Sequence, residues 1–166
     1  HGGLPIAELS MDRLNLFLGG KGARGWQLHQ LLCTQTTGLV ARSTDRRADW
    51  TLPLLGTAVP KGFSSEEALL PTPRQSFDGY RLLQEYFAMP ERFHFVELNG
   101  LSRGLARTVG SEMDVYILLR DGLPSIEAGI TPDAFSLHCV PAINLFEKCC
   151  DRVQITTQQV EHHVVV

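Results

Sequence analysis

The residues with the clearest capacity for chemistry form a glycine-rich loop between a predicted strand and a predicted helix. A G-x-G-x-x-G pattern occurs in the stretch LNLFLGGKGARGWQLHQLL (residues 14–32), where it consists of Gly20, Gly22 and Gly25. Free N–H groups at such a helix start could bind a phosphate, and Lys21 could add positive charge. Asp45 lies 20 residues beyond Gly25, where a ribose-binding acid belongs. The loop therefore supports one hypothesis, a nucleotide-binding domain that uses residues 20–25.

Three features of the same region oppose that hypothesis. The first strand of a dinucleotide fold is covered on both faces and is continuously apolar, whereas this strand carries Arg13 and Asn15 on its second face. The third glycine of the pattern normally lies inside the helix, but Gly25 is expected to precede it, beside the bulky Trp26. No regular alternation of strands and helices follows Arg42. We therefore prefer a turn that simply requires flexible residues.

Other arrangements with catalytic or metal-binding potential are weaker. The histidines at 162–163 would point to opposite faces of a strand, and residues 138–139 with the cysteines at 149–150 lack the paired spacing of structural zinc sites. There is no G-x-S-x-G elbow, and residues 64–67, SSEE, are better interpreted as a helix N-cap followed by acids. We expect no catalytic residue, cofactor or metal, with an undetected hydrolase site as an open alternative.

Composition sets the broad class of the protein. The 166 residues are 43% hydrophobic and 20% charged, with a formal net charge of -3, so charge gives no tendency toward nucleic acid or anionic lipid. The longest apolar run is far shorter than the ~20 residues of a membrane span, and the N-terminus has no signal-type core. We expect a cytoplasmic protein that neither binds nucleic acid nor inserts into a membrane.

Periodicity predicts an α+β fold with mainly antiparallel or mixed sheets, two principal helices and short helical turns. Residues 14–18 alternate as a strand, residues 26–36 follow a helical rhythm, and residues 39–42 form a second strand, which suggests a β-α-β unit or an imitation of one. Prolines then restrict the chain to short elements. We place a boundary there, with a β-α-β lobe at 1–60 and a helix plus β-rich lobe at 61–166, or one continuous domain.

The strongest predicted helix spans residues 76–89, with Ser76 as N-cap, Asp78 in the first turn and Pro90 as its end. Two adjacent apolar stripes are expected to be buried, namely Phe77, Tyr80, Leu83 and Phe87, then Leu82, Tyr86 and Met89. The polar side is left to Arg81, Gln84 and Glu85. Either the whole apolar surface belongs to the core, which we prefer, or another chain covers part of it.

Strands dominate the sequence after this helix. Residues 93–98 alternate, residues 113–119 form a largely apolar strand, and residues 153–157 and 160–166 also have an extended pattern. A mainly antiparallel sheet or sandwich is the expected result.

Two longer stretches resemble a known family. Residues 62–101, GFSSEEALLPTPRQSFDGYRLLQEYFAMPERFHFVELNGL, and residues 137–155, LHCVPAINLFEKCCDRVQI, resemble the TssF family (also ImpG or VasA) of the bacterial type VI secretion system baseplate. The final VEHHVVV is similar to the strand that follows in that family. The resemblance covers essentially the whole chain and implies a middle fragment of a longer protein, consistent with ends that look cut.

The resemblance implies a non-enzymatic structural role in a baseplate docked at the cytoplasmic face of the inner membrane. The implied partners are a TssG-like wedge protein, further TssF copies, a TssK-like adaptor, and hub and sheath components. No catalytic residue carries over. The residues that match the family motifs are expected to have structural roles, with Asn144 at a turn and Leu145 and Phe146 in the core. They are Phe63, Leu70, Pro71, Phe77, Gly79, Tyr80, Arg81, Leu83, Gln84, Glu85, Tyr86, Phe87, Pro90, Phe93, Pro141, Asn144, Leu145 and Phe146.

Overall fold

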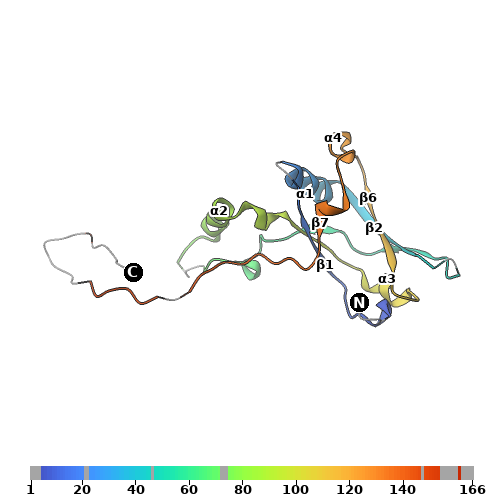
Figure 1. Cartoon of the computed structure of the whole chain (residues 1–166), viewed down its shortest axis with the longest axis horizontal. Coiled ribbons are helices and arrows are strands. Elements are labelled where there is room, and N and C mark those ends of the chain that lie inside the picture. The colour runs from blue at the N-terminus through green and yellow to red at the C-terminus, as the bar shows by residue number, and fades with distance from the viewer. Residues whose placement is uncertain are drawn as a thin grey trace.

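Two antiparallel sheets organise the computed structural model, which describes residues 5–20, 23–45, 47–71, 75–146, 148–153 and 161. The strands are β1 Leu14–Leu18, β2 Thr36–Ser43, β3 Thr51–Leu54, β4 Ala58–Pro60, β5 Phe95–Leu98, β6 Met113–Leu119 and β7 Phe135–Ser136. The α-helices are α1 Arg24–Gln35, α2 Asp78–Ala88, α3 Ser102–Arg107 and α4 Pro124–Glu127. Short 3-10 turns are η1 Ile6–Glu8, η2 Ser65–Glu67, η3 Pro90–His94 and η4 Pro132–Ala134. The predicted α+β class is confirmed (Figure 1).

Each sheet combines strands from distant parts of the sequence. The four-stranded sheet has the order β4-β5-β1-β7, and the three-stranded sheet has the order β3-β2-β6. Strands β1 and β2 lie in different sheets, so the predicted β-α-β unit is wrong as a parallel pair. Both sheets contain strands from before and after residue 60, which favours the continuous-domain alternative, although separate lobes at 1–60 and 61–166 stay a prediction.

The core forms where the two sheets approach each other and α1. Strand β1 buries Leu16 and Leu18 and exposes Asn15, which confirms the alternation predicted for it. In β2, the side chains of Leu39 and Ala41 are fully covered. Apolar side chains of α1 and α3 complete the same cluster. Helix α1 ends at Gln35 and β2 begins at Thr36, so no linker separates the helix from the second sheet.

The start of α1 differs from the sequence prediction. The helix begins at Arg24, so Gly25 lies inside it instead of before it. A Cβ atom added to Gly25 would come within 2.9 Å of the His94 ring and 3.1 Å of the Leu18 carbonyl oxygen. Glycine is therefore required because it lets α1 approach β1 and η3 closely. Trp26 does not crowd this approach; its ring packs edge-on against His94, with centroids 4.3 Å apart.

Several boundaries farther along also depart from the prediction. Residues 93–98 were expected to alternate as one strand, but residues 90–94 form η3, and all four residues of β5 are buried. Helix α2 begins at Asp78, with Phe77 instead of Ser76 at the N-cap, and it ends before Pro90 as predicted. Strand β6 has the predicted bounds, 113–119. The expected strand at 160–166 and most of 153–157 lie outside the described residues.

Burial of two histidines makes the stability of the fold depend on pH. His94 is buried, and its Nε2 atom has no hydrogen-bond partner. Burial lowers the pKa of His94, and this outweighs the raising influence of Glu91 and the Leu18 backbone. Burial and the proximity of His94 also lower the pKa of His29. Below the ordinary histidine pKa, the unfolded chain therefore binds more protons than the folded chain.

We expect the free energy of unfolding to decrease as the pH falls from about 7.5 to about 5.5, by at most ~1.4 kcal/mol per pH unit for each histidine. Urea unfolding at each pH measures this slope. The variant His94→Gln should show a shallower slope, since one of the two proton-binding rings is gone. An identical slope in wild type and variant would contradict this role for His94.

Candidate functional site

The inward side of α2 is polar, which reverses the predicted orientation of this helix. Arg81 and Glu85 are only 3% and 2% exposed, although they were expected on the polar edge. Arg81 donates from Nε and Nη2 to the two carboxylate oxygens of Asp78, at 2.8 and 3.0 Å, and from Nη1 to Glu85 Oε2 at 3.1 Å. This fork geometry satisfies most of the guanidinium donors.

A second arginine, from η3, completes a buried ion cluster. The Arg92 guanidinium is 1% exposed and forms an ion pair with Glu85 Oε2. Its Nη2 atom also donates to the carbonyl oxygens of Gly62 and Glu67, each at 2.8 Å. The cluster of Asp78, Arg81, Glu85 and Arg92 thus pairs two positive with two negative side chains; Arg81, Glu85 and Arg92 are buried, whereas Asp78 lies at the surface.

The ion cluster also holds the irregular segment at residues 61–71. Glu85 Oε1 accepts hydrogen bonds from the backbone N–H groups of Leu69 and Leu70, at 2.9 and 3.0 Å. Within the segment, Ser64 and Glu67 form the capping box of η2, which confirms the predicted N-cap. Glu67 also pairs with Lys61. One carboxylate of α2 therefore satisfies two backbone N–H groups of this irregular segment.

The pKa values of the two arginines shift in opposite directions. Hydrogen bonding to Asp78 raises the pKa of Arg81. Burial, followed by repulsion from Arg81, lowers the pKa of Arg92. Both guanidinium groups remain charged at neutral pH, because the ordinary arginine pKa lies far above neutral pH. Glu85 lies between the two guanidinium groups and forms an ion pair with each of them.

We expect Glu85→Ala to lower the free energy of unfolding by about 3–5 kcal/mol, since it leaves buried charge unpaired and removes the acceptor of two backbone N–H groups. The matched control is Gln84→Ala, one residue earlier on the exposed side of α2, which should change stability by less than about 0.5 kcal/mol. Urea denaturation followed by circular dichroism measures both. Equal stabilities for the two variants would show that the ion cluster does not support the fold.

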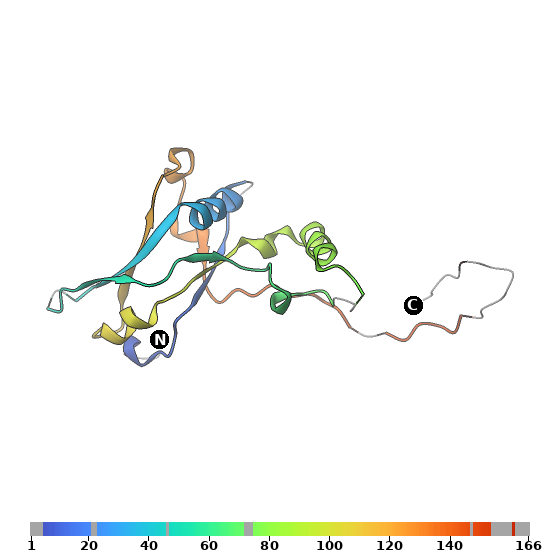
Figure 2. The ribbon, with the colours of Figure 1, turned by 180° about the vertical axis from the view of Figure 1, so that it is seen from behind.

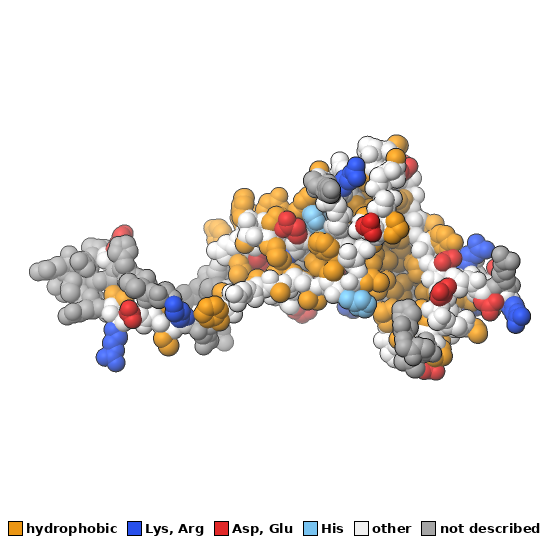
Figure 3. Space-filling model, in the orientation of Figure 1, with side chains coloured by type: hydrophobic (Ala, Val, Ile, Leu, Met, Phe, Trp, Pro, Cys, Tyr) orange, Lys and Arg blue, Asp and Glu red, His pale blue; other side chains and the backbone are white. Residues whose placement is uncertain are grey.

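The outward side of α2 carries the large apolar side chains that were expected in the core. Phe77 is 73% exposed and Phe87 is 81% exposed, and Tyr80, Leu83 and Tyr86 are exposed as well. Figure 3 shows hydrophobic side chains gathered over this part of the molecule. The prediction that the stripe of Phe77, Tyr80, Leu83 and Phe87 is buried in the core is wrong for this structure. We call this surface the α2 outer face; it consists of Phe77, Tyr80, Leu83, Tyr86 and Phe87.

A hollow of about 380 Å³ lies at the base of the α2 outer face. Its walls come from three parts of the chain, because α2, η3 and α1 converge here around the exposed ring of Phe63. All of its lining residues are apolar or aromatic: Trp26, Phe63, Gly79, Leu82, Leu83, Tyr86 and Phe93. Such a hollow suits a large apolar side chain of a partner, as the central pockets of interfaces do.

Two phenylalanines near this hollow should respond differently to truncation. Phe93 is 3% exposed, so Phe93→Ala should lower the free energy of unfolding by about 3–5 kcal/mol. Phe87→Ala should change it by less than about 0.5 kcal/mol, because water already covers that ring. Thermal and urea unfolding of the two variants measure the contrast. A large loss of stability in Phe87→Ala would contradict this prediction and show that the Phe87 ring is buried in the core.

The second group of motif residues lies in an extended segment after β7. Residues 137–146 run away from the sheets without regular structure (Figure 2). Leu145 and Phe146 are exposed, so the expectation that they fill the core is wrong for this structure, and Asn144 is exposed instead of holding a turn. Pro141 is half-buried and lines two hollows beside β1 and η3.

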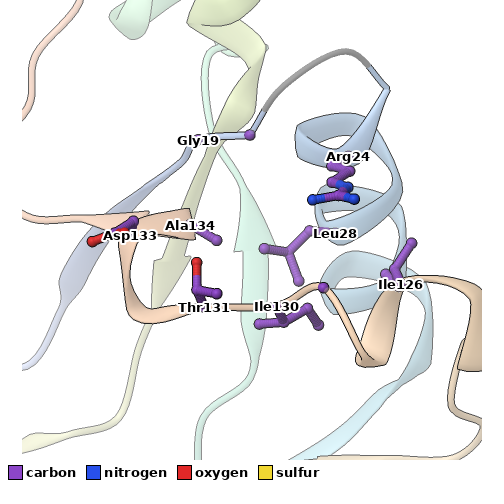
Figure 4. A pocket seen from close by; sticks show the side chains of 10 residues that line it. Gly19, Arg24, Leu28, Ile126, Ile130, Thr131, Asp133 and Ala134 are labelled. Atoms are coloured by element: carbon purple, nitrogen blue, oxygen red, sulfur yellow. The ribbon is translucent and has the colours of Figure 1, made fainter.

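The glycine loop adjoins a separate cavity of about 370 Å³ between α1 and residues 126–134. Figure 4 shows Arg24 at the helix end and Leu28 and Ile130 lining the cavity. A dinucleotide fold requires a parallel first strand, but β1 pairs antiparallel with both β5 and β7. Lys21 and Gly22 lie outside the described residues. The structure therefore gives the nucleotide-binding alternative no support.

The motif residues thus fall into two places. Those from Phe63 to Phe93 gather around α2, either in its ion cluster or on and beside its outer face, whereas those from Pro141 to Phe146 lie in the extended segment. Sequence reasoning missed Arg92 and Trp26. For Arg92, the one signal in the sequence was its position directly before Phe93, a phenylalanine that is buried. Among the described residues, no cluster of three potential metal ligands occurs, and no helix is long and apolar enough to span a membrane.

A large exposed aromatic face beside an apolar hollow is typical of a surface that another protein segment covers. The sequence model of the family "Type VI secretion system, TssF" matches residues 1–166, and the chain belongs to the TssF family. It is 38% identical over 164 residues to type VI secretion system component TssF1 of Pseudomonas aeruginosa, covering 99% of this chain and 26% of that protein.

A solved structure supports the same relationship. The fold is similar to a chain in the cryo-electron microscopy structure of the type VI secretion system TssK-TssF-TssG baseplate subcomplex, with a TM-score of 0.66 and 34% sequence identity. The similarity covers 84% of this chain and 26% of that chain. The chain therefore corresponds to about a quarter of the relatives that it matches.

Proposed function

We propose that this chain is a non-enzymatic structural part of the type VI secretion system baseplate wedge, and that the α2 outer face binds a TssG-like wedge partner. The observation that carries this proposal is the reversed orientation of α2. Its charged side chains are buried and its aromatic side chains are exposed. Folded proteins are only marginally stable, and a large apolar surface left in water is unfavourable. Such a surface is therefore expected to be buried by a partner in the assembled state.

The size of the α2 outer face fits a stable contact. A large aromatic side chain has roughly 150–250 Å² of surface, so five exposed side chains and Phe63 together offer an area on the order of the ~800 Å² per partner of a standard interface. Aromatic residues are also enriched at the energetic centre of interfaces. The adjoining apolar hollow would accept a partner side chain.

The relatives support the wider setting of the proposal. A matching chain comes from a complex of TssK, TssF and TssG, which supports TssG-like and TssK-like partners for this chain. Contacts with further TssF copies and with hub and sheath components belong to the same proposal, as does a cytoplasmic location. In this setting the chain performs no chemistry and acts by presenting surfaces.

Co-expression of this chain with a TssG-like protein from the same genome tests the proposal. Phe87→Ser and Tyr80→Ser should each reduce co-purification by at least about 10-fold at unchanged melting temperature, since they remove aromatic anchors without touching the core. The control is Leu55→Ser, an equally exposed apolar residue in the β3 to β4 turn, which should co-purify like wild type. Co-purification of all variants at the wild-type level would overturn the assignment of this face.

A further inference from the structure

Strand β6 leaves one long edge of the three-stranded sheet open. It is the last strand in the order β3-β2-β6, and within the described ranges no strand pairs with its outer side. Figures 1 and 2 both show it at the margin of the sheet. The other described edge strands are protected: β7 has two residues, β4 has three and ends at Pro60, and β3 contains Pro53. Strand β6 has seven residues and contains no proline, so neither short length nor proline protects its edge.

The hydrogen bonds at the ends of β6 show which backbone groups face outward. The N–H group of Arg120 donates to Gln35, and the carbonyl oxygens of Leu118 and Glu112 accept from threonine hydroxyls of the β2 side. Because backbone groups alternate along a strand, even-numbered residues direct theirs toward β2. The N–H and C=O groups that point to the open edge belong to Met113, Val115, Ile117 and Leu119.

The side chains of β6 divide between the two faces of the sheet. Met113, Val115 and Ile117 pack against the core. The even-numbered residues Asp114, Tyr116 and Leu118 are exposed and form a row, with the exposed Glu112 directly before the strand and the exposed Arg120 directly after it. With these two flanking residues, the row begins with negative charge, ends with a positive charge, and has two large apolar groups between them.

We propose that a second copy of this chain pairs with β6 through its own β6, antiparallel and across a two-fold axis at Ile117. In this register Asp114 lies opposite Arg120 of the second copy, and Tyr116 lies opposite Leu118 of the second copy. The two-fold axis repeats both contacts, so two opposite-charge pairs and two aromatic–aliphatic pairs form. The outward backbone groups of Val115, Ile117 and Leu119 find their partners in the same arrangement.

The position of Asp114 favours this register over its neighbour. An axis at Tyr116 would also satisfy the backbone and would pair Arg120 with Glu112 of the second copy, but it would place the Asp114 carboxylate opposite Leu118 of the second copy. An axis at Ile117 leaves no charge of the exposed row opposite an apolar side chain. Within one chain, Asp114 and Arg120 stand at opposite ends of the row and form no ion pair with each other. Any coupling between these two residues is therefore intermolecular.

A charge-swap series measured by sedimentation equilibrium, from about 1 to about 500 μM, tests the pairing. The wild-type chain should dimerise, and Asp114→Lys or Arg120→Glu should each weaken the dimer about 10-fold, since two pairs become repulsive. The double variant Asp114→Lys/Arg120→Glu should recover wild-type affinity. A monomer throughout the range, or a double variant no tighter than the single variants, would overturn the proposal.

Disulfide trapping checks the register independently. In a background with Cys33, Cys139, Cys149 and Cys150 changed to serine, Tyr116→Cys and Leu118→Cys chains should crosslink when mixed, because they form a pair without backbone hydrogen bonds, where Cα atoms lie about 4.5 Å apart. Crosslinking of Tyr116→Cys chains alone would overturn the Ile117 axis. Phe87→Ser, on the α2 outer face, should dimerise like wild type, which separates this pairing from the proposed TssG-like contact.

Discussion

The Glu85 carboxylate is the constraint on which the rest of the candidate site depends. It lies between two buried guanidinium groups and also accepts the backbone N–H groups of Leu69 and Leu70. Taking these charges out of water is unfavourable, and only close pairing with several hydrogen bonds offsets that unfavourable term. Because this pairing fixes which side of α2 faces inward, it also fixes which side faces outward. The α2 outer face is thus a consequence of charge pairing beneath the helix.

Sequence periodicity predicted β1, α1, β2, α2 and β6, but it gave the wrong orientation for α2, and that error has a physical reason. A helical period shows which residues share a face, and the spacing of Phe77, Tyr80, Leu83 and Phe87 was correctly interpreted in that sense. It does not show which face is buried when the polar face has partners elsewhere. Those partners are Arg92 and the backbone N–H groups of Leu69 and Leu70, which reach Glu85 of α2 only in the folded chain. They lie outside residues 78–88, over which the helical period is measured, so the period carries no information about them.

The same limit applied to the sheets and to the glycine loop. Strands β1 and β6 were predicted from local patterns, but their neighbours lie far away in the chain, as in the register of Leu16 with Val96 and of Ala41 with Val115. The short turn η3 was missed because its buried residues resemble the start of β5. Gly25 was misplaced because its role depends on His94, which is nearly 70 residues later. Family resemblance supplied the assembly role, which periodicity alone did not indicate.

The direct passage from α1 into β2 couples the two layers of the molecule mechanically. Gln35 ends the helix and Thr36 begins the strand, so no flexible residue separates the two elements. Gly25, at the other end of α1, is pressed against β1 and η3. We therefore expect helix α1 to connect the two sheets rigidly, so that a rotation of the three-stranded sheet would turn the helix as well. Through Trp26, whose ring contacts both His94 and Tyr86, such a rotation reaches α2 without passing through any loop.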